Sequence, residues 1–387
     1  MAVNILAAAR TPVGKFGGAL KSHSAVSLGS VALKAALERS KIPAAADVSE
    51  VYMGHVLQGG VGQSPARQAA IGAGLPASTD ATTINKVCAS GLKAVMLSAQ
   101  TISAGAADVI AAGGMESMSN VPYYLPRQTR GFGDITASDG IVHDGLWDVY
   151  NKIHMGSCAE NTARKFGLTR EAQDDFAKLS YERARAAQAA GAFAAEMAPV
   201  EVKSRKGSAT VDADEEPGSA DLARLGSLRP AFEKDGTVTA GNASTINDGA
   251  SAVVLASAAY TAQHGLQPLG RVVAYADAAR DPIDFTIAPA LAIPRALERA
   301  GLTAADVARF EINEAFSAVA LANVSLLGLD IDKVNPAGGA VALGHPIGSS
   351  GCRILVTLLH GLKPGEFGVA AICNGGGAAS AMVVQRT

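Results

Sequence analysis

Short, mainly apolar runs alternate along the chain with longer alanine-rich stretches whose apolar positions recur at helical spacing. Residues 1–9 and 107–112 are apolar runs, whereas 31–37 and 91–104 have the helical pattern. Apolar runs of this length are typical of buried strands when helical segments separate them. The pattern therefore predicts an α/β protein whose sheets are sandwiched between helices.

One order of elements occurs twice. The segments 90–113 and 350–373 each begin with Ser-Gly at a predicted helix start, pass into an apolar strand and end at a turn. The strands are 107–112 and 367–372, and the number of positions from the first glycine to the turn is the same in both. Equal spacing favours a duplicated fold. The alternative is chance similarity between two alanine-rich segments.

The middle of the chain differs in composition from both flanks. Most acidic and basic pairs lie between residues 119 and 246, which also contain a stretch rich in Gly and Asp at 131–145 and a polar segment at 212–219. Such an insertion predicts a loop domain over an active site. The expected division is an N-terminal half of residues 1–118 plus 247–268, a loop domain of 119–246 and a C-terminal half of 269–387.

Composition and charge exclude several classes of protein. With 387 residues, 48% of them hydrophobic and 18% charged, the chain can bury a large core in two or three domains. The net charge of −2 gives no attraction to nucleic acid or to anionic membranes. No apolar run reaches the roughly 18 residues of a membrane span, and residues 1–9 end at Arg10 without a preceding basic region. We expect a cytoplasmic or mitochondrial-matrix protein, with a processed transit peptide as an open alternative.

The chain has four cysteines, and their flanking residues separate them into two kinds. Cys158 and Cys352 are interpreted as small buried hydrophobic residues. Cys88 precedes Ala-Ser-Gly and a helix-forming run, so its sulfur should lie at a helix N-terminus, where the dipole and free N–H groups favour the thiolate. Cys88 is therefore a candidate nucleophile. Lys86 is a candidate activating cation, although in an extended segment its side chain can point elsewhere.

Two further segments carry candidate chemistry. His345 has a glycine on one side, a rigid Pro346 on the other and Gly348 beyond, which singles it out among seven histidines as a base. Cys373 follows an apolar strand and opens a turn of Asn and three glycines. No phosphate-loop or dinucleotide-binding spacing accompanies this turn. Its glycines instead favour free N–H groups for an oxyanion and close approach of a substrate to Cys373.

Four segments in combination resemble the thiolase family, specifically the acetoacetyl-CoA thiolases. They are Asn-Lys-Val-Cys-Ala-Ser-Gly at 85–91, Asn-Glu-Ala-Phe at 313–316, Gly-His-Pro at 344–346 and Cys-Asn-Gly-Gly-Gly at 373–377. The resemblance runs from residue 9 to the C-terminus. It implies duplicated α/β halves stacked in layers (αβαβα), with an inserted loop domain that holds coenzyme A. It also implies reversible condensation of two acetyl-CoA to acetoacetyl-CoA and CoA, without a prosthetic group.

The resemblance assigns roles to the candidate residues. Cys88 would receive the acetyl group, His345 would take the proton of its thiol, and Cys373 would remove a proton from the methyl group of the second acetyl thioester. One oxyanion hole would consist of His345 and a water held by Asn313. The other would consist of the backbone N–H groups of Cys88 and Gly375. Glu314 would support this arrangement.

Contacts to coenzyme A and to an activating ion follow from the same resemblance. His154 would contact the pantetheine arm, and Met155 and Phe285 would narrow the acyl pocket. The remaining expected pantetheine contacts are Leu228, Phe232, Ala243, Ser244, Ala315 and Phe316. Family members have basic residues for the nucleotide end where this chain has Gly218 and Ala223, which makes Arg224 a candidate substitute.

A finer match is to the potassium-activated mitochondrial type, through residues 148–158 and 281–285. The places of its K⁺ ligands are taken here by Tyr181, Ala240, Gly241, Ala243 and Val341. Oxygen ligands suit such a hard cation. That type has Phe-Pro where this chain has Phe285-Thr286, which leaves acceptance of 2-methyl-branched substrates open.

Several alternatives remain at this level. A broader 3-ketoacyl-CoA thiolase and a non-catalytic CoA or lipid carrier share the same descent. A decarboxylating ketoacyl synthase would use two histidines with its cysteine, and Asn313 takes one of those places. The expected partners are acetyl-CoA, acetoacetyl-CoA and CoA, with no nucleic acid and no membrane, in a homotetramer that is a dimer of dimers.

Overall fold

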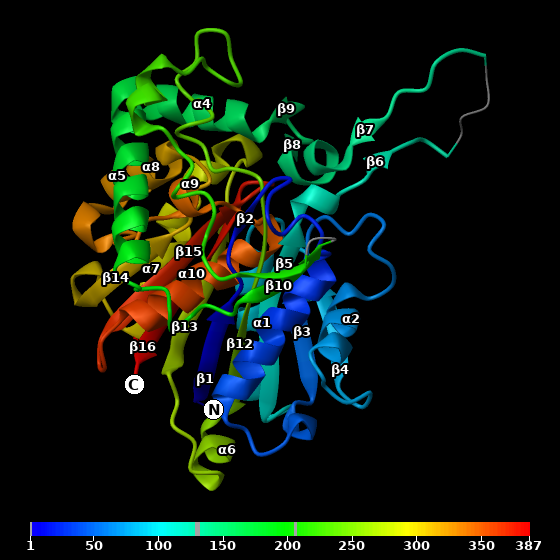
Figure 1. Ribbon diagram of the computed structural model, residues 1–387. Helices are drawn as coiled ribbons and strands as arrows, with labels where there is room; N and C mark the ends of the chain where they lie inside the picture. The colour runs from blue at the N-terminus through cyan, green and yellow to red at the C-terminus, as the bar shows by residue number, and fades with distance from the viewer. Residues whose placement is uncertain (1, 128–131, 205–206) are drawn as a thin grey trace.

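One mixed sheet runs through the molecule (Figure 1). The computed structural model describes residues 2–127, 132–204 and 207–387. The sheet has ten strands in the order β14-β15-β16-β13-β1-β12-β5-β3-β4, with β2 paired to β12. The strands are β1 (Val3–Arg10), β2 (Gly14–Lys15), β3 (Glu50–Gly54), β4 (Asp80–Ile84), β5 (Val109–Ser117), β12 (Asn247–Ser257), β13 (Gly270–Ala279), β14 (Val307–Ile312), β15 (Phe367–Asn374) and β16 (Ala378–Arg386).

The pairing pattern of this sheet confirms the predicted duplication. In the first half β1 pairs with β12 and β12 with β5, both antiparallel, and β5 pairs with β3 in parallel. In the second half β13 pairs with β16 and β16 with β15, again antiparallel, and β15 pairs with β14 in parallel. Strands β1 and β13 join the halves over three residue pairs.

The helices repeat in the same order. They are α1 (Ala25–Ser40), α2 (Pro65–Gly72), α3 (Ser90–Ser103), α4 (Met155–Phe166), α5 (Arg170–Ala189), α6 (Ala258–Gln263), α7 (Pro289–Ala300), α8 (Ser317–Leu327), α9 (Ala340–Leu343) and α10 (Ile347–Gly361). Helix α1 follows β1 as α7 follows β13, and α3 precedes β5 as α10 precedes β15. Because both halves carry equivalent helices, the duplication extends beyond the sheet.

Three apolar clusters show the layers. The central cluster contains residues of α3 and α10 packed between strands of both halves, including Val95, Leu355 and Ile372. A second cluster places α1 and α2 against the outer face of the N-terminal half, and a third places α7 and α8 against the outer face of the C-terminal half. The predicted αβαβα stack is therefore confirmed, with α3 and α10 as its inner layer.

Main-chain contact determines how closely α10 approaches β5. A Cβ atom on Gly114 would lie 2.0 Å from the carbonyl oxygen of Gly348, so only glycine fits there. The prediction that Gly113-Gly114 forms a turn is wrong, because β5 continues to Ser117. The predicted helix start at Ser350 is also wrong, since α10 begins at Ile347. In both places the glycines serve close packing, which gives the same sequence signal as a turn.

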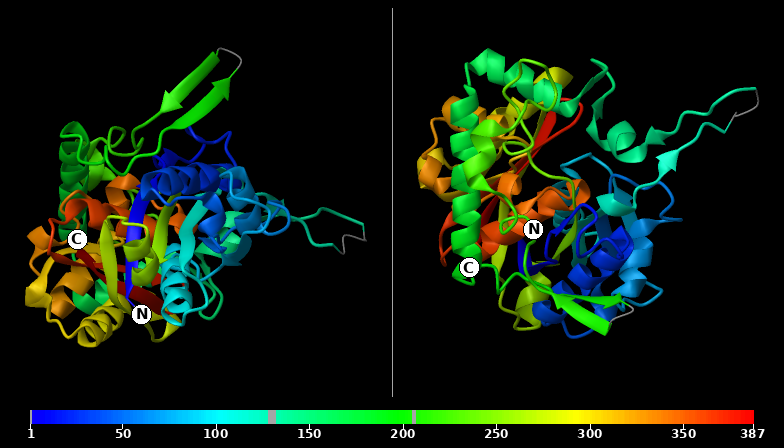
Figure 2. Two further views of the ribbon diagram at one scale, coloured as in Figure 1. Left: turned by 90° about the horizontal axis from the view of Figure 1, so that it is seen from below. Right: turned by 45° about the horizontal axis from the view of Figure 1, so that its top comes forward.

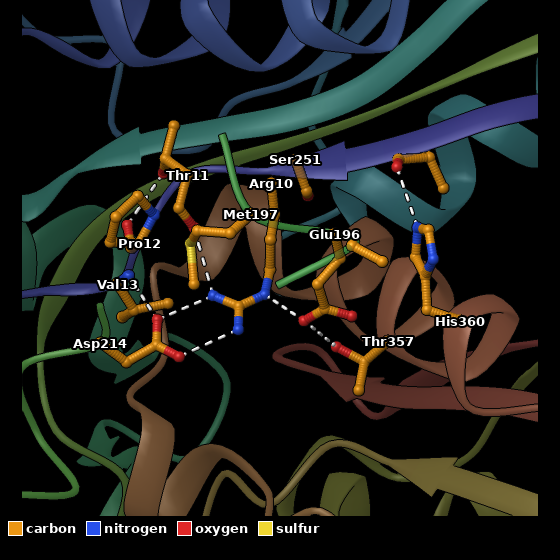
Figure 3. Close-up of polar contacts among 12 residues, drawn as sticks. Arg10, Thr11, Pro12, Val13, Glu196, Met197, Asp214, Ser251, Thr357 and His360 are labelled. Atoms are coloured by element: carbon orange, nitrogen blue, oxygen red, sulfur yellow. Dashed lines mark hydrogen bonds and ion pairs between the residues drawn. The ribbon is translucent and has the colours of Figure 1, made fainter. Parts of the chain in front are cut away.

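The segment between the halves contains α4, α5, several short strands and short segments of 3-10 and π helix. The strands are β6 (Tyr123–Tyr124), β7 (Ser138–Asp139), β8 (Trp147–Asp148), β9 (Ile153–His154), β10 (Val200–Ser204) and β11 (Gly207–Val211). In both views of Figure 2 an arm that includes β6 and β7 extends away from the body. Figure 3 shows how the other part of the segment is attached: the buried Arg10 of β1 donates to Glu196 and, at 2.7 Å, to Asp214. No described helix has both the length and the apolar character that crossing a bilayer requires.

Candidate active site

A cavity of about 250 Å³ lies where the two halves and the inserted segment meet. Cys88 and His345 both line it, and they come from different halves of the chain. Its other walls are mainly apolar and consist of Met118, Gly145, Leu146, His154, Met155, Phe232, Ala243, Ser244, Thr245, Ile246, Phe285, Ala315, Phe316 and Ile347. The cavity therefore combines a thiol and an imidazole with a largely water-excluding surface.

Cys88 lies in the turn between β4 and α3, two residues before the helix begins. Its sulfur accepts hydrogen bonds from the backbone N–H groups of Gly375 and of Cys88 itself. Burial nevertheless raises the pKa of the thiol to about 12, and the carboxylate of Glu116 adds to that rise. The predicted helix N-terminus is confirmed, but desolvation outweighs the dipole and the donors, so the thiol stays neutral without the neighbouring base that the sequence also predicts. A base is therefore required to form the nucleophile.

Lys86 does not activate the thiol directly. Its ammonium group donates to Asp277 and, at 2.9 Å, to Ser380 Oγ, both in the C-terminal half.

His345 is positioned by the turn that precedes α10. Gly344 has φ of 96°, and a Cβ atom there would lie 2.5 Å from the side chain of Asn247. Asn247 Oδ1 accepts the backbone N–H of His345 at 2.9 Å, which ties the turn to β12. The imidazole Nδ1 lies 2.6 Å from Ser350 Oγ, whose hydroxyl donates to the carbonyl of Pro346 at 3.0 Å. Nδ1 is therefore the protonated nitrogen, and Nε2 carries the lone pair that can accept a proton.

The charge state of His345 matches the role of a base. Burial, with a smaller contribution from the nearby cation of Arg353, lowers its pKa to about 3. The ring is therefore neutral at physiological pH, and its Nε2 can accept a proton. A neutral thiol beside a neutral imidazole is a pair in which proton transfer accompanies attack on a substrate.

Asn313 and Glu314 follow strand β14. The side-chain amide nitrogen of Asn313 lies 3.5 Å from His345 Nε2, and its Oδ1 is buried without a hydrogen-bond partner among the described residues. Such an orphaned oxygen suits an ordered water or a substrate group. Glu314 is fully buried and accepts from Ser180, Asn335 and the N–H of Val341. It therefore supports the segment that leads to His345 and does not face the cavity.

Cys373 lies near the end of β15, almost completely buried. It belongs to one apolar cluster with Phe285, Ala315 and Phe316, which also line the cavity. Burial raises the pKa of its thiol, and the nearby Cys88 adds to the rise. The structure thus brings both thiols into one region, as the sequence predicted.

The predicted pantetheine contacts mostly meet at the cavity. His154, Met155, Phe232, Ala243, Ser244, Phe285, Ala315 and Phe316 all line it. The ring of His154 stacks on Phe232 with centroids 4.8 Å apart, and burial lowers the pKa of the imidazole. Leu228 and the exposed Arg224 lie outside the lining residues. Sequence reasoning missed Met118, Gly145, Leu146, Thr245, Ile246 and Ile347 in the wall, and Asn247 and Ser350 behind His345.

Three of the five candidate ion ligands belong to two different apolar clusters. Tyr181 and Val341 share one apolar cluster, and Ala243 belongs to the cluster around the cavity. The hydroxyl of Tyr181 is buried, and burial together with the carboxylate of Glu216 raises its pKa to about 12. Within the described ranges no group of three or more His, Cys, Asp or Glu side chains is placed to hold a metal ion. Main-chain and tyrosine oxygens are thus the ligands that this region offers.

Comparison with known proteins agrees with this geometry. Residues 3–259 match the family model described as the thiolase N-terminal domain, and residues 266–386 match the thiolase C-terminal domain. An acetyl-CoA acetyltransferase of Yarrowia lipolytica is 60% identical over 100% of this chain and 96% of its own length. The mitochondrial acetyl-CoA acetyltransferase of Mus musculus is 53% identical over 99% of this chain and 91% of its own.

A solved structure extends the likeness to three dimensions. The crystal structure of a thiolase from Ascaris suum in complex with coenzyme A superposes with a TM-score of 0.97, at 47% identity and with complete coverage of both chains. Both domain matches and the full-length relatives lead to one conclusion: the chain belongs to the thiolase family.

Proposed function

We propose that the protein is an acetyl-CoA C-acetyltransferase, which condenses two acetyl-CoA to acetoacetyl-CoA and CoA and also catalyses the reverse cleavage. The observation that carries this proposal is one apolar cavity that holds Cys88 and a neutral His345, with the second thiol of Cys373 in the adjoining cluster. Full-length relatives named acetyl-CoA acetyltransferases support it. A carrier protein would need neither the base nor the second thiol.

The first half-reaction acylates Cys88. His345 Nε2 accepts the thiol proton as the sulfur attacks the thioester carbonyl, and the tetrahedral intermediate then expels the thiolate of CoA. That thiolate takes a proton from Cys373, which leaves Cys373 as a thiolate. The N–H of Gly375 would stabilise negative charge on the acyl oxygen, and its hydrogen bond to Cys88 Sγ supports this role.

The second half-reaction forms the carbon–carbon bond. The Cys373 thiolate removes a proton from the methyl group of a second acetyl-CoA, and the resulting enolate attacks the carbonyl carbon of acetyl-Cys88. His345 and a water on Asn313 stabilise the enolate oxygen, consistent with the orphaned Oδ1 of Asn313. Collapse of the intermediate releases acetoacetyl-CoA and returns the thiol of Cys88, whose proton comes from His345.

The size of the cavity favours a short acyl chain. Met155 and Phe285 are large, nearly buried and part of one wall, which leaves about 250 Å³ in total. A broader 3-ketoacyl-CoA thiolase would need a wider channel at this wall. Acceptance of a 2-methyl branch does not follow from the cavity volume. It depends on the wall beside Phe285, where the hydroxyl of Thr286 forms a buried hydrogen bond with that of Thr162.

The test of this function has two parts. The protein is incubated with labelled acetyl-CoA, digested and analysed by mass spectrometry, and we expect the acetyl group on Cys88. Thiolysis of acetoacetyl-CoA is then compared with thiolysis of 3-ketohexadecanoyl-CoA at equal CoA. Stable label on Cys373 alone would refute the assignment of the nucleophile, and efficient cleavage of the long substrate would favour the broader thiolase.

We propose a homotetramer built from two kinds of contact. Strand β4 is the last strand of the sheet and leads directly to Cys88, so its free edge suits antiparallel pairing with a second copy. The projecting arm exposes large apolar side chains, with Tyr123 70% and Leu125 61% exposed. Such residues are typical of an interface, and the arm can join two dimers. Light scattering should show a tetramer for the parent and a dimer for Leu125→Asp.

We propose K⁺ as an activator held by Tyr181 and the main-chain oxygens of Ala240, Gly241, Ala243 and Val341. Ala243 lines the cavity, so an ion there would order the segment that contacts the pantetheine arm. Assays in KCl and NaCl at equal ionic strength test this, with Tyr181→Phe as the variant that lacks one oxygen ligand. Equal kinetics in both salts for the parent would refute it.

We also propose a division into an N-terminal half (1–118 plus 247–268), a loop domain (119–246) and a C-terminal half (269–387), and a location in the mitochondrial matrix or the cytoplasm. Strand β12 returns to the sheet between β1 and β5, which supports assigning residues 247–268 to the N-terminal half. Mitochondrial relatives support a matrix location, with the cytoplasm as the alternative. Limited proteolysis tests the domain division, and fractionation with a specific antibody tests the compartment.

A further inference from the structure

The turn that carries Cys88 has a strained backbone. It spans residues 85–90, between β4 and α3, and we call it the nucleophile turn. Val87, directly before Cys88, has φ of 48°. A β-branched side chain is a rare occupant of this left-handed region, because its Cβ substituents crowd the backbone. Strain of this kind persists only where surrounding contacts over-determine the conformation.

Hydrogen bonds inside the turn account for only part of that constraint. The N–H of Val87 donates to Asn85 Oδ1 at 2.9 Å, and the N–H of Lys86 donates to Ser90 Oγ at 2.8 Å. The hydroxyl of Ser90 in turn donates to the carbonyl of Val87 at 2.6 Å. All of these bonds link residues of the turn to each other. They shape the turn but do not fix its position relative to the C-terminal half.

The side chain of Lys86 supplies that link. Its ammonium group donates to Asp277 on β13 and, at 2.9 Å, to Ser380 on β16. Asp277 and Ser380 are paired across these two strands, and the hydroxyl of Ser380 donates to Asp277 at 2.6 Å. Lys93, on α3 itself, donates to the second oxygen of Asp277 at 2.8 Å. One carboxylate thus binds two lysines from the opposite half.

The carboxylate of Asp277 stays charged over the working pH range. Its side chain is 36% exposed, and its partial burial acts to raise the pKa. The bonds from Lys86, Lys93 and Ser380 outweigh burial and lower the pKa to about 2. An ionised and partly buried carboxylate with three fixed donors is a firmer anchor than an exposed ion pair.

The anchor belongs to the same hairpin as the second thiol. Cys373 is the next-to-last residue of strand β15, Gly375 follows the strand in the turn, and β16 contains Ser380. Cys373 pairs with Ala379, next to Ser380, and Gly375 donates its N–H to the sulfur of Cys88. Lys86 therefore links the nucleophile turn to the β15–β16 hairpin, whose turn contains Gly375.

We propose that Lys86 is a positioning residue, which uses Asp277 and Ser380 to hold the strained nucleophile turn so that Cys88 faces Gly375 and the second thiol. This inference rests on the proposed role of Cys88 as the nucleophile. Lys86 touches neither substrate nor the reacting atoms in this role. Its loss lets Val87 relax towards negative φ and rotates the sulfur away from its donor.

Lys86→Met and Lys93→Met are matched variants that test the proposal. Each removes one cation from Asp277, but only Lys86 belongs to the nucleophile turn. We expect Lys86→Met to lower kcat for thiolysis of acetoacetyl-CoA by about 10- to 100-fold with little change in KM for CoA, since small misplacements of reacting groups cost rates of that order. Lys93→Met should change kcat by about twofold or less. The rate at which iodoacetamide alkylates Cys88 should change more in Lys86→Met than in Lys93→Met.

A double-mutant cycle separates positioning from general destabilisation. Glycine adopts the left-handed region without strain, so Lys86→Met should cost less activity in a Val87→Gly background than in the parent. Lys86→Arg should retain most of the activity, because it keeps the bond to Asp277. Equal kcat and alkylation rates for Lys86→Met and Lys93→Met, or an equal cost of Lys86→Met in both backgrounds, would overturn the proposal. Failure of the proposed function would instead appear as a parent that is not acetylated on Cys88.

Discussion

Helices α3 and α10 occupy equivalent places in the two halves, and each has a catalytic candidate two residues before its first turn. Cys88 precedes α3 in a partly exposed, strained turn, whereas His345 precedes α10 in a buried turn tied to Asn247 and Ser350. Burial raises the pKa of the thiol to about 12 and lowers that of the imidazole to about 3. Desolvation of the sulfur and of the imidazole ring thus keeps both groups neutral, although the two turns differ in exposure.

This comparison shows how duplication can supply a complementary pair. Two copies of one helix start meet at a single cavity because α3 and α10 pack side by side in the inner layer. One copy carries the thiol, and the other carries the imidazole that we propose as the base for that thiol. The two turns differ in chemistry because their local contacts differ, although the fold of the two halves is the same.

The largest expected effect comes from the α3 side. Cys88→Ser replaces a thiol with a hydroxyl that is far less acidic, so His345 can no longer generate a nucleophile. We expect thiolysis of acetoacetyl-CoA to fall by about 10⁴-fold or more, by analogy with other nucleophile deletions. Intact-protein mass spectrometry should show no acetylated species, and an acetylated serine variant with appreciable turnover would break the comparison.

A smaller effect should separate the two half-reactions. Cys373→Ala removes the second base but leaves Cys88 and His345 in place. Loss of a general base typically costs about 10²–10⁴-fold, so condensation should fall by that range. Acetylation of Cys88 by acetyl-CoA should fall less, because the CoA thiolate can leave without the proton that Cys373 supplies, as measured by rapid quench and mass spectrometry. If both rates fall equally, Cys373 acts in acylation as much as in condensation.

The smallest effect is on stability and belongs to the α10 side. His345 stays neutral in the folded protein down to about pH 3, whereas in the unfolded chain it titrates near 6.5. Below pH 6.5 the unfolded state therefore binds a proton that the folded state does not, so stability falls as pH drops from 6.5 towards 3. At pH 5 this amounts to about 2 kcal/mol. Urea unfolding at pH 7.5 and pH 5 measures the difference.

The matched controls for this prediction are His345→Asn and Cys88→Ser. His345→Asn should lose about 2 kcal/mol less than the parent between the two pH values, because asparagine does not titrate. Cys88→Ser should keep the acid dependence of the parent, since its thiol titrates far above this range. An unchanged acid dependence in His345→Asn would show that the imidazole is not held neutral.

Local motifs were sufficient to point to the candidate reacting groups that the structure brings to one region. Cys88, His345 and Cys373 each stand beside glycines at an element boundary, so short segments of sequence revealed them. The helix start before α3 could be read from the sequence, but the burial that keeps the Cys88 thiol neutral could not, because burial depends on contacts between distant segments. Gly113 and Gly348 were equally ambiguous, since a glycine needed for close packing gives the same signal as a glycine in a turn.

Residues that contact the candidate site from distant positions in the sequence could not be recognised from a local motif. Asn247 fixes the backbone of His345 from 98 positions away, and Asp277 binds Lys86 from 191 positions away. Met118 and Ile246 reach the cavity only because β5 and β12 are neighbours in the sheet. Pairing between remote strands decides these contacts, and a single sequence does not reveal it.

The contact between Gly114 and Gly348 has a consequence for how this enzyme can change. Main-chain atoms set the spacing of β5 and α10 there, so the alignment of thiol and base does not depend on which side chains fill the cavity wall. Met155 and Phe232 come from the inserted segment and can be exchanged without moving that alignment. Redesign for longer or branched acyl groups should therefore begin at Met155 and Phe232, and should leave α3 and α10 unchanged.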